Sequence, residues 1–141
     1  MNIKKQNGFT LIELLVVIVV LSILASFAIP RYINFQRNAK AAVIENVAGV
    51  LVSAIEMTHL KYIVEGSDDN RVRVEGAVVR MRFGYPTRLG LLNAVKLHAV
   101  QSSNGNYFVK GHQNRNCSVK YIPPNRSNGL RYRVIVNTTG C

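Results

Sequence analysis

The chain has 141 residues, enough for a single domain, and 48% of them are hydrophobic, which is typical of a globular protein. Its formal net charge is +11, from 18 Lys and Arg against 7 Asp and Glu. The three histidines, His59, His98 and His112, are isolated, and no cluster of His, Cys or carboxylates has metal-ligand spacing. No nucleophile motif or phosphate-binding glycine run is present. We therefore expect no enzyme activity, cofactor or metal, and histidines that serve at the surface or in packing.

The first residues form a short basic leader, MNIKKQNG at 1–8. In an ordinary signal peptide the small residue at the cleavage site follows the apolar stretch, whereas here Gly8 precedes it. A cut after Gly8 would remove Lys4 and Lys5, lower the net charge from +11 to +9, and keep the apolar stretch in the mature chain.

The leader is followed by a hydrophobic run, FTLIELLVVIVVLSILASFAI at 9–29, whose one charge is Glu13. As a helix it would be roughly 30 Å long, the thickness of a bilayer core, so 9–30 is predicted to span a membrane. Pro30 removes one helical hydrogen bond and predicts a kink or local melting there.

The second half of the predicted helix, 31–62, is amphipathic. Between 37 and 62 apolar and small side chains recur at three- and four-residue spacing, which predicts a stripe that packs on a sheet. The members of this stripe are Ala39, Val43, Val47, Val50, Leu51, Ala54, Ile55 and Thr58.

The remaining part, 63–141, is predicted to be a strand-rich head, so the fold class is α+β. Residues 71–74 and 78–83 alternate around Glu75 and Gly76, which indicates a hairpin. Thr87 is placed to cap a short helix over 89–99, and a turn is expected at 102–106. Further strands are predicted at 107–110, 117–122 and 130–136.

Two cysteines, Cys117 and Cys141, lie in this head. A segment that follows a membrane anchor with positive charges on its short N-terminal side is expected outside the cytoplasm, where a disulfide persists. A disulfide between them would close the loop 117–141 and stabilise the fold by roughly 3 kcal/mol. The alternative is two free, buried thiols.

The sequence GFTLIELLVVIVVLSILASFAIP at 8–30 resembles the class III signal of type IV pilins and type II secretion pseudopilins. The resemblance places Gly8 before the cut, Phe9 after it, and Glu13 and Pro30 at their usual positions. It implies cleavage after Gly8 and N-methylation of Phe9 by a prepilin peptidase. It also implies that Glu13 is an assembly contact, which neutralises the N-terminus of a neighbouring subunit. The alternative is that Glu13 neutralises its own N-terminus on the first helical turn.

The head resembles MSHA (mannose-sensitive haemagglutinin) type pilins in FGYPTRLGLLNAV at 83–95, the strand at Cys117, and VIVNTTGC at 134–141. This likeness implies a type IV pilin fold, with a long N-terminal helix, kinked near Pro30, packed on an antiparallel sheet. It implies a structural subunit of an adhesive pilus for surface attachment and biofilm formation. A type II secretion pseudopilin is the alternative.

The same resemblance implies the surroundings of the chain. The expected partners are identical or related pilin subunits, the prepilin peptidase and the pilus assembly platform. The subunit would sit in the inner membrane as a single-pass protein before assembly, and then in an extracellular pilus of a Gram-negative bacterium.

The head is strongly basic, because ten Lys and Arg follow Glu75 with no acid among them. If the strands that carry them are neighbours, several guanidinium groups form a patch for DNA phosphates or an anionic surface polysaccharide, with Tyr107, Tyr121 and Tyr132 stacking on bases. The chain would then be a minor pilin that captures such a polymer. The alternative is solvated sheet faces, or contacts with Asp68 and Asp69 of neighbouring subunits. The candidate patch is Arg80, Arg82, Arg88, Arg131 and Arg133.

Overall fold

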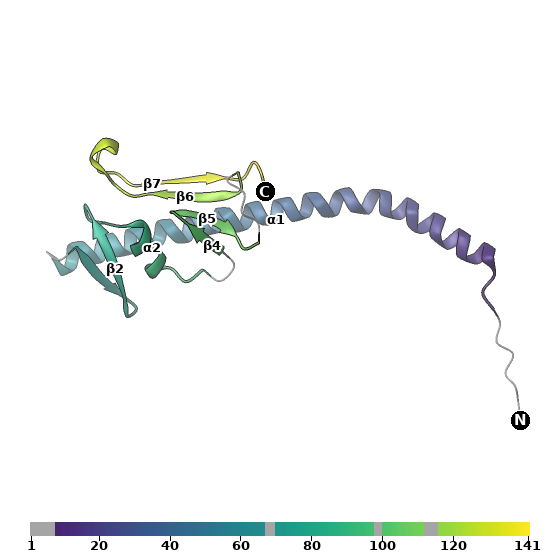
Figure 1. Ribbon diagram of the computed structural model, residues 1–141, viewed down its shortest axis with the longest axis horizontal. Coiled ribbons are helices and arrows are strands. Elements are labelled where there is room, and N and C mark those ends of the chain that lie inside the picture. The colour runs from purple at the N-terminus through teal and green to yellow at the C-terminus, as the bar shows by residue number, and fades with distance from the viewer. Residues whose placement is uncertain (1–7, 67–69, 98–99, 112–115) are drawn as a thin grey trace, which may run out of the picture. The chain divides into compact units, whose positions relative to one another are not determined.

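The computed structural model describes residues 8–66, 70–97, 100–111 and 116–141 (Figure 1). It confirms the α+β class, with one long helix, α1 (Leu11–Glu65), followed by a head of antiparallel sheets. The chain divides into two compact units, with the boundary in the sequence between Arg37 and Asn38. The leader residues 1–7, and Asp68, Asp69, His98 and His112, lie outside the described residues.

The N-terminal unit is the first part of α1. Its apolar side chains are exposed all round the helix, from Leu11 at 81% to Phe35 at 68%. Within the described residues α1 is the one helix long and apolar enough to cross a membrane, by its length and composition. Its polar hydroxyls are satisfied internally, since Ser22 donates to the Ile18 carbonyl and Ser26 to the Ile23 carbonyl, both at 2.6 Å. The helix continues through Pro30, so the predicted local melting is wrong, and the kink stays a prediction.

Two antiparallel sheets form the head. The first contains β1 (Arg71–Val74), β2 (Ala77–Arg82) and β3 (Tyr85–Pro86), in that order. The second contains β4 (Val100–Ser103), β5 (Asn106–Val109), β6 (Ser118–Ile122) and β7 (Arg133–Asn137). Between them in sequence lies α2 (Arg88–Ala94), and a 3-10 turn (Arg126–Asn128) separates β6 from β7.

Three of the predicted elements of the head differ from the observed ones by more than one residue at an end. The last strand, predicted over 130–136, begins only at Arg133 as β7, and Leu130 before it has a φ of 59°. The short helix α2 ends at Ala94 rather than 99, because Val95 is already extended. Strand β4 occupies positions where a turn was predicted, because Val100–Ser103 pairs with β5 across a tight turn at Asn104 and Gly105. Thr87 caps α2 as predicted, accepting a hydrogen bond from the Gly90 amide at 3.0 Å.

The main core lies between α1 and the four-stranded sheet. Leu51 and Ile55 of α1 are fully buried in one cluster with Leu91, Val119 and Tyr121. The predicted helix stripe was partly wrong, because Val43 and Val50 are 37% and 39% exposed while Ile44 and Ala48 are buried. Residues 41–55 are apolar on more than one face, so their spacing alone did not identify the face that the sheet covers.

The antiparallel pairing of β6 with β7 brings the two cysteines together. Ser118 lies opposite Asn137 in this ladder, and the Gly140 amide donates to the Asn116 carbonyl at 2.8 Å. Cys117 and Cys141 form a disulfide with an S–S distance of 2.02 Å. The predicted bridge is confirmed, and the alternative of two free thiols is wrong.

Candidate functional site

The N-terminal processing residues lie at the exposed start of the chain's first unit. A Cβ added at Gly8 would meet nothing within 4 Å, and Phe9 is 77% exposed. The folded chain therefore has no steric need for glycine at position 8. A requirement for Gly8 would come from an enzyme that reads this site.

Glu13 takes part in a capping box at the start of α1. The Thr10 amide donates to Glu13 Oε2 at 3.0 Å, the Thr10 hydroxyl donates to the same oxygen at 2.8 Å, and the Glu13 amide donates to Thr10 Oγ1 at 3.4 Å. Glu13 therefore stabilises its own helix start through Thr10, and its predicted charge contact, with its own or a neighbouring N-terminus, stays a prediction. The role of Thr10 was missed, although the Thr-x-x-Glu spacing at 10–13 indicates a capping box.

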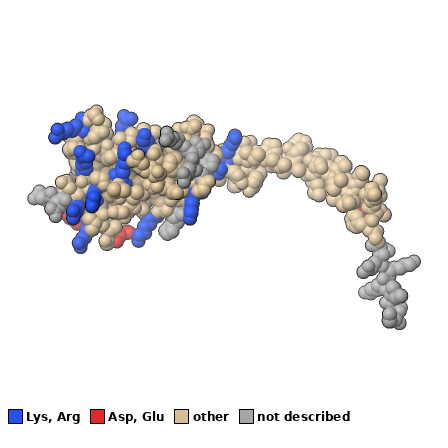
Figure 2. Space-filling model, in the orientation of Figure 1, with Lys and Arg blue, Asp and Glu red and all other residues tan. Residues whose placement is uncertain are grey.

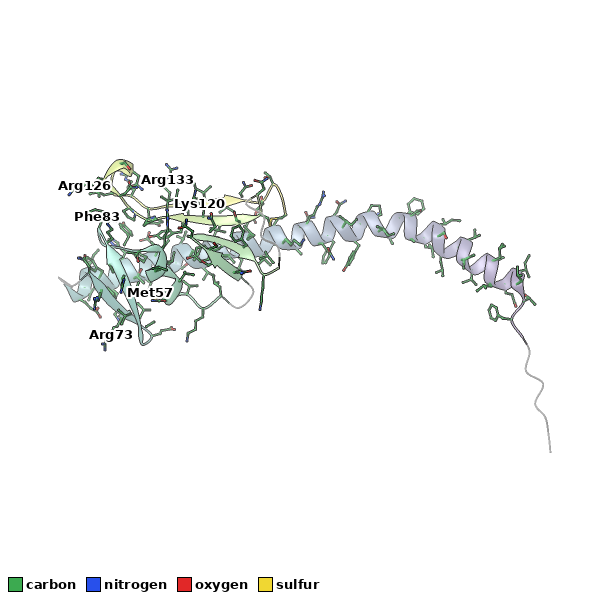
Figure 3. All side chains as sticks on the ribbon, viewed as in Figure 1. Met57, Arg73, Phe83, Lys120, Arg126 and Arg133 are labelled. Atoms are coloured by element: carbon green, nitrogen blue, oxygen red, sulfur yellow. A yellow bond between two sulfur atoms is a disulfide. The ribbon has the colours of Figure 1, made fainter. Side chains whose placement is uncertain are left out.

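The neighbouring strands on which the suggested basic patch depended are not found among the described residues. Strands β2 and β7 belong to different sheets, so their arginines are not on neighbouring strands. Figure 2 shows Lys and Arg spread over the visible face of the head. Figure 3 shows Arg126 and Arg133 on the β6–β7 side and Arg73 at the opposite edge.

Three arginines of the proposed patch do come together, because Arg80, Arg82 and Arg88 line one cavity of about 680 Å³. Arg80 and Arg82 alternate with the buried residues Val79 and Met81 along β2, and so face outward. Arg131 and Arg133 are not in the lining of this cavity.

Of the three tyrosines proposed to stack on bases, two are buried and the third contacts other side chains. Tyr107 and Tyr121 are 1% and 0% exposed, inside the main core. The Tyr132 hydroxyl donates to Glu56 Oε1 at 2.5 Å, and its ring packs against Tyr85. Burial raises the pKa of Tyr107 to about 12, and the hydrogen bond to Glu56 raises the pKa of Tyr132 to about 12. The prediction of base stacking is therefore wrong for Tyr107 and Tyr121, and for the half-buried Tyr132 it stays a prediction.

His59 is a packing residue. Its ring stacks on Tyr85 with centroids 4.1 Å apart, and its Nδ1 lies 2.7 Å from the Gly84 carbonyl oxygen. Among the described residues no three His, Cys, Asp or Glu side chains are grouped to hold a metal ion.

The N-terminal region matches a family model described as the prokaryotic N-terminal methylation motif, over residues 3–29. The chain is 41% identical over 51 residues to the type IV major fimbrial protein FimA of Dichelobacter nodosus, covering 36% of this chain and 33% of that protein. It is 41% identical over 70 residues to the type II secretion system core protein G of Vibrio cholerae, covering 48% and 47%. It is 30% identical over 106 residues to the fimbrial protein of Neisseria meningitidis, covering 75% and 62%.

The chain thus spans between a third and just under two thirds of the length of these curated relatives. No solved structure matches it at a significant level.

Proposed function

We propose that this chain, a member of the type IV pilin and pseudopilin family, is a structural subunit that polymerises through its N-terminal hydrophobic helix into an adhesive type IV pilus. The observation that carries the proposal is the exposed apolar surface of α1 from Leu11 to Phe35, most of which lies within residues 3–29 that match the methylation motif. An apolar surface of this size needs a cover, and lipid before assembly and neighbouring helices afterwards both supply one.

Glu13 gives these apolar helices a polar contact that can fix their register. Within the described residues both local hydrogen bonds to its carboxylate go to Oε2, which leaves Oε1 able to accept one from another chain. We propose that cleavage after Gly8 supplies the donor, the freed and methylated amine of Phe9 in a neighbouring subunit. A charge-assisted bond of this kind is stronger and more directional than contacts between apolar side chains.

The prepilin peptidase and an assembly platform in the inner membrane of a Gram-negative bacterium are the partners of this route. The MSHA-like sequence of the head supports surface attachment and biofilm formation as the role of the pilus. A DNA-binding minor pilin is less favoured, because the tyrosines that would stack on bases are buried or engaged.

A type II secretion pseudopilin is the second candidate, and the similarity to core protein G of Vibrio cholerae favours it. Immunogold electron microscopy with an antibody to the head separates the two. Label along surface filaments supports the pilus subunit. Label confined to the cell envelope, with secretion lost on deletion of the gene, supports the pseudopilin.

Three substitutions at two positions of the helix start test the role of Glu13. Glu13→Gln removes the charge but retains a side chain that completes a capping box, whereas Thr10→Ala removes the cap hydroxyl and retains the charge. We expect Glu13→Gln and Glu13→Ala to be cleaved normally and to lose assembly, and Thr10→Ala to assemble. Sheared-pilus yield and the size of the processed chain are the readouts. Normal piliation by Glu13→Gln would refute the intersubunit charge contact.

A further inference from the structure

We propose that the cavity lined by Arg80, Arg82 and Arg88 binds a uronic acid residue of an acidic polysaccharide, with the sugar carboxylate at the guanidinium groups. This gives the adhesive role proposed above a ligand class, and it is tested on the isolated subunit without a filament. The cavity, here called the arginine cavity, has a volume of about 680 Å³ and opens on the head between β2, α2 and the segment that follows β6.

The charge of the arginine cavity is unbalanced. Of the residues that the structure describes, three arginines line it and no Asp or Glu does. Among the described residues none of the three arginines makes an ion pair. The acidic residue nearest to them in sequence, Glu75, lies on the hairpin turn and not in the lining of the cavity. Guanidinium groups are planar forks that bind carboxylates with two parallel hydrogen bonds. An anion therefore suits this cavity better than a neutral ligand.

Arg88 is held in place for such a contact. Its Nη1 donates to Asn104 Oδ1 at 3.0 Å, and its Nε is buried without a hydrogen-bond partner in the described part of the chain. Gly105 lets the side chain lie against the turn, since a Cβ there would be 3.0 Å from Arg88 Cδ. Because the guanidinium is already fixed by Asn104 and the buried Nε, it loses less side-chain entropy when its remaining N–H groups bind a ligand than a free arginine would.

The rest of the lining explains the preference for a sugar over a nucleic acid. Leu89, Leu92, Ile122, Pro123 and Pro124 supply apolar walls, which suit the C–H faces of a pyranose ring. The lining contains no Phe, Tyr or Trp for stacking bases. Asn104 and Asn125 supply amide groups for ring hydroxyls.

The test measures binding of tetragalacturonate to the full-length subunit in detergent micelles by isothermal titration calorimetry at about 0.15 M salt. The fully methyl-esterified tetramer is the neutral control, and a short duplex DNA is the rival ligand. Arg82→Gln and Arg88→Gln remove a charge from the arginine cavity. Arg73→Gln is the matched control, because Arg73 is also exposed on a strand but lies at the other edge of the head (Figure 3).

We expect the uronate to bind and the ester not to bind, with roughly tenfold weaker affinity in each cavity variant and less than a twofold change in Arg73→Gln. Asn104→Ala, which frees Arg88 without removing its charge, should weaken binding severalfold. Circular dichroism checks that each variant is folded, and Arg82 is exposed, so its replacement leaves the core intact. Equal losses in Arg73→Gln and Arg82→Gln would overturn the proposal in favour of diffuse charge attraction. Absence of uronate binding, or binding of DNA alone, would also overturn it.

Discussion

Two buried tyrosines of the head differ in whether the hydroxyl makes a hydrogen bond. This difference allows a test of how much one hydrogen bond between the two sheets contributes to stability. The Tyr121 hydroxyl on β6 donates to the Pro86 carbonyl on β3 at 2.6 Å, and so joins the four-stranded sheet to the three-stranded one. The Tyr107 hydroxyl on β5 is buried and, in the described part of the chain, has no hydrogen-bond partner. Both rings lie in the same core cluster.

Tyr121→Phe should lower the free energy of unfolding by roughly 1–3 kcal/mol, because it deletes a bond and leaves the Pro86 carbonyl unpaired. Tyr107→Phe removes a hydroxyl that has no partner, so it should be neutral or stabilising by up to about 1 kcal/mol. For a head of this size the first change lowers Tm by roughly 5–15 °C, and the second leaves Tm unchanged or raises it.

Thermal unfolding of the full-length chain in detergent, followed by near-UV circular dichroism, measures both values. The near-UV signal reports on the head, since α1 dominates the far-UV signal with 55 residues. Equal destabilisation by the two variants would refute the reasoning, because it would mean that ring packing rather than the hydroxyl bond sets the cost.

Three further predictions concern the same head. Burial raises the pKa of Tyr107 from 10.0 to about 12, so this tyrosine loses its proton at lower pH in the unfolded chain than in the folded one, and the free energy of unfolding should fall as pH rises from about 10 to about 12. Tm measured against pH should fall less steeply for Tyr107→Phe than for the parent. Identical slopes would contradict this prediction. Replacing Cys117 and Cys141 together by serine should lower the free energy of unfolding by about 3 kcal/mol, measured by denaturant unfolding with the reduced parent protein as control. A reduced parent protein as stable as the oxidised one would contradict this prediction. Gly90→Ala should destabilise by about 1–3 kcal/mol, because its Cβ would lie 2.4 Å from the Arg80 carbonyl oxygen; Gly49→Ala, where a Cβ meets nothing within 4 Å, is the control that should not lose stability.

Local signals in the sequence predicted the elements whose structure is locally determined. The hairpin β1–β2 follows from Glu75 and Gly76, which have φ of 47° and 82°, the pattern of a tight two-residue turn. The same kind of turn, Asn104-Gly105, with φ of 49° and 79°, joins β4 to β5. Strand β4 was missed because Val100–Ser103 has only a weak apolar pattern, although this turn indicates a strand on each side of it.

Features that depend on long-range pairing could not be predicted in this way. The arginine cavity needs Arg88 to lie across from Asn104 and Pro123, and no sequence period relates these segments. Strands β2 and β7 lie in different sheets, so the arginines of the expected basic patch are not on neighbouring strands. One local signal was missed: Cys117, Val119 and Tyr121 alternate along the chain, which indicates that Tyr121 shares an inward face with Val119 and cannot reach a ligand.

If the head holds on to a surface as proposed, the disulfide has a mechanical consequence. The turn between β6 and β7 contributes Pro123 and Pro124 to the arginine cavity, and the two strands that lead away from it are joined covalently near their other ends. A pull on this turn cannot peel β7 away from β6 from the cysteine end, because the bridge holds that end shut. The load on the turn is then carried by both strands, because β7 is fastened to Cys117 through the bridge and does not depend on its hydrogen bonds alone.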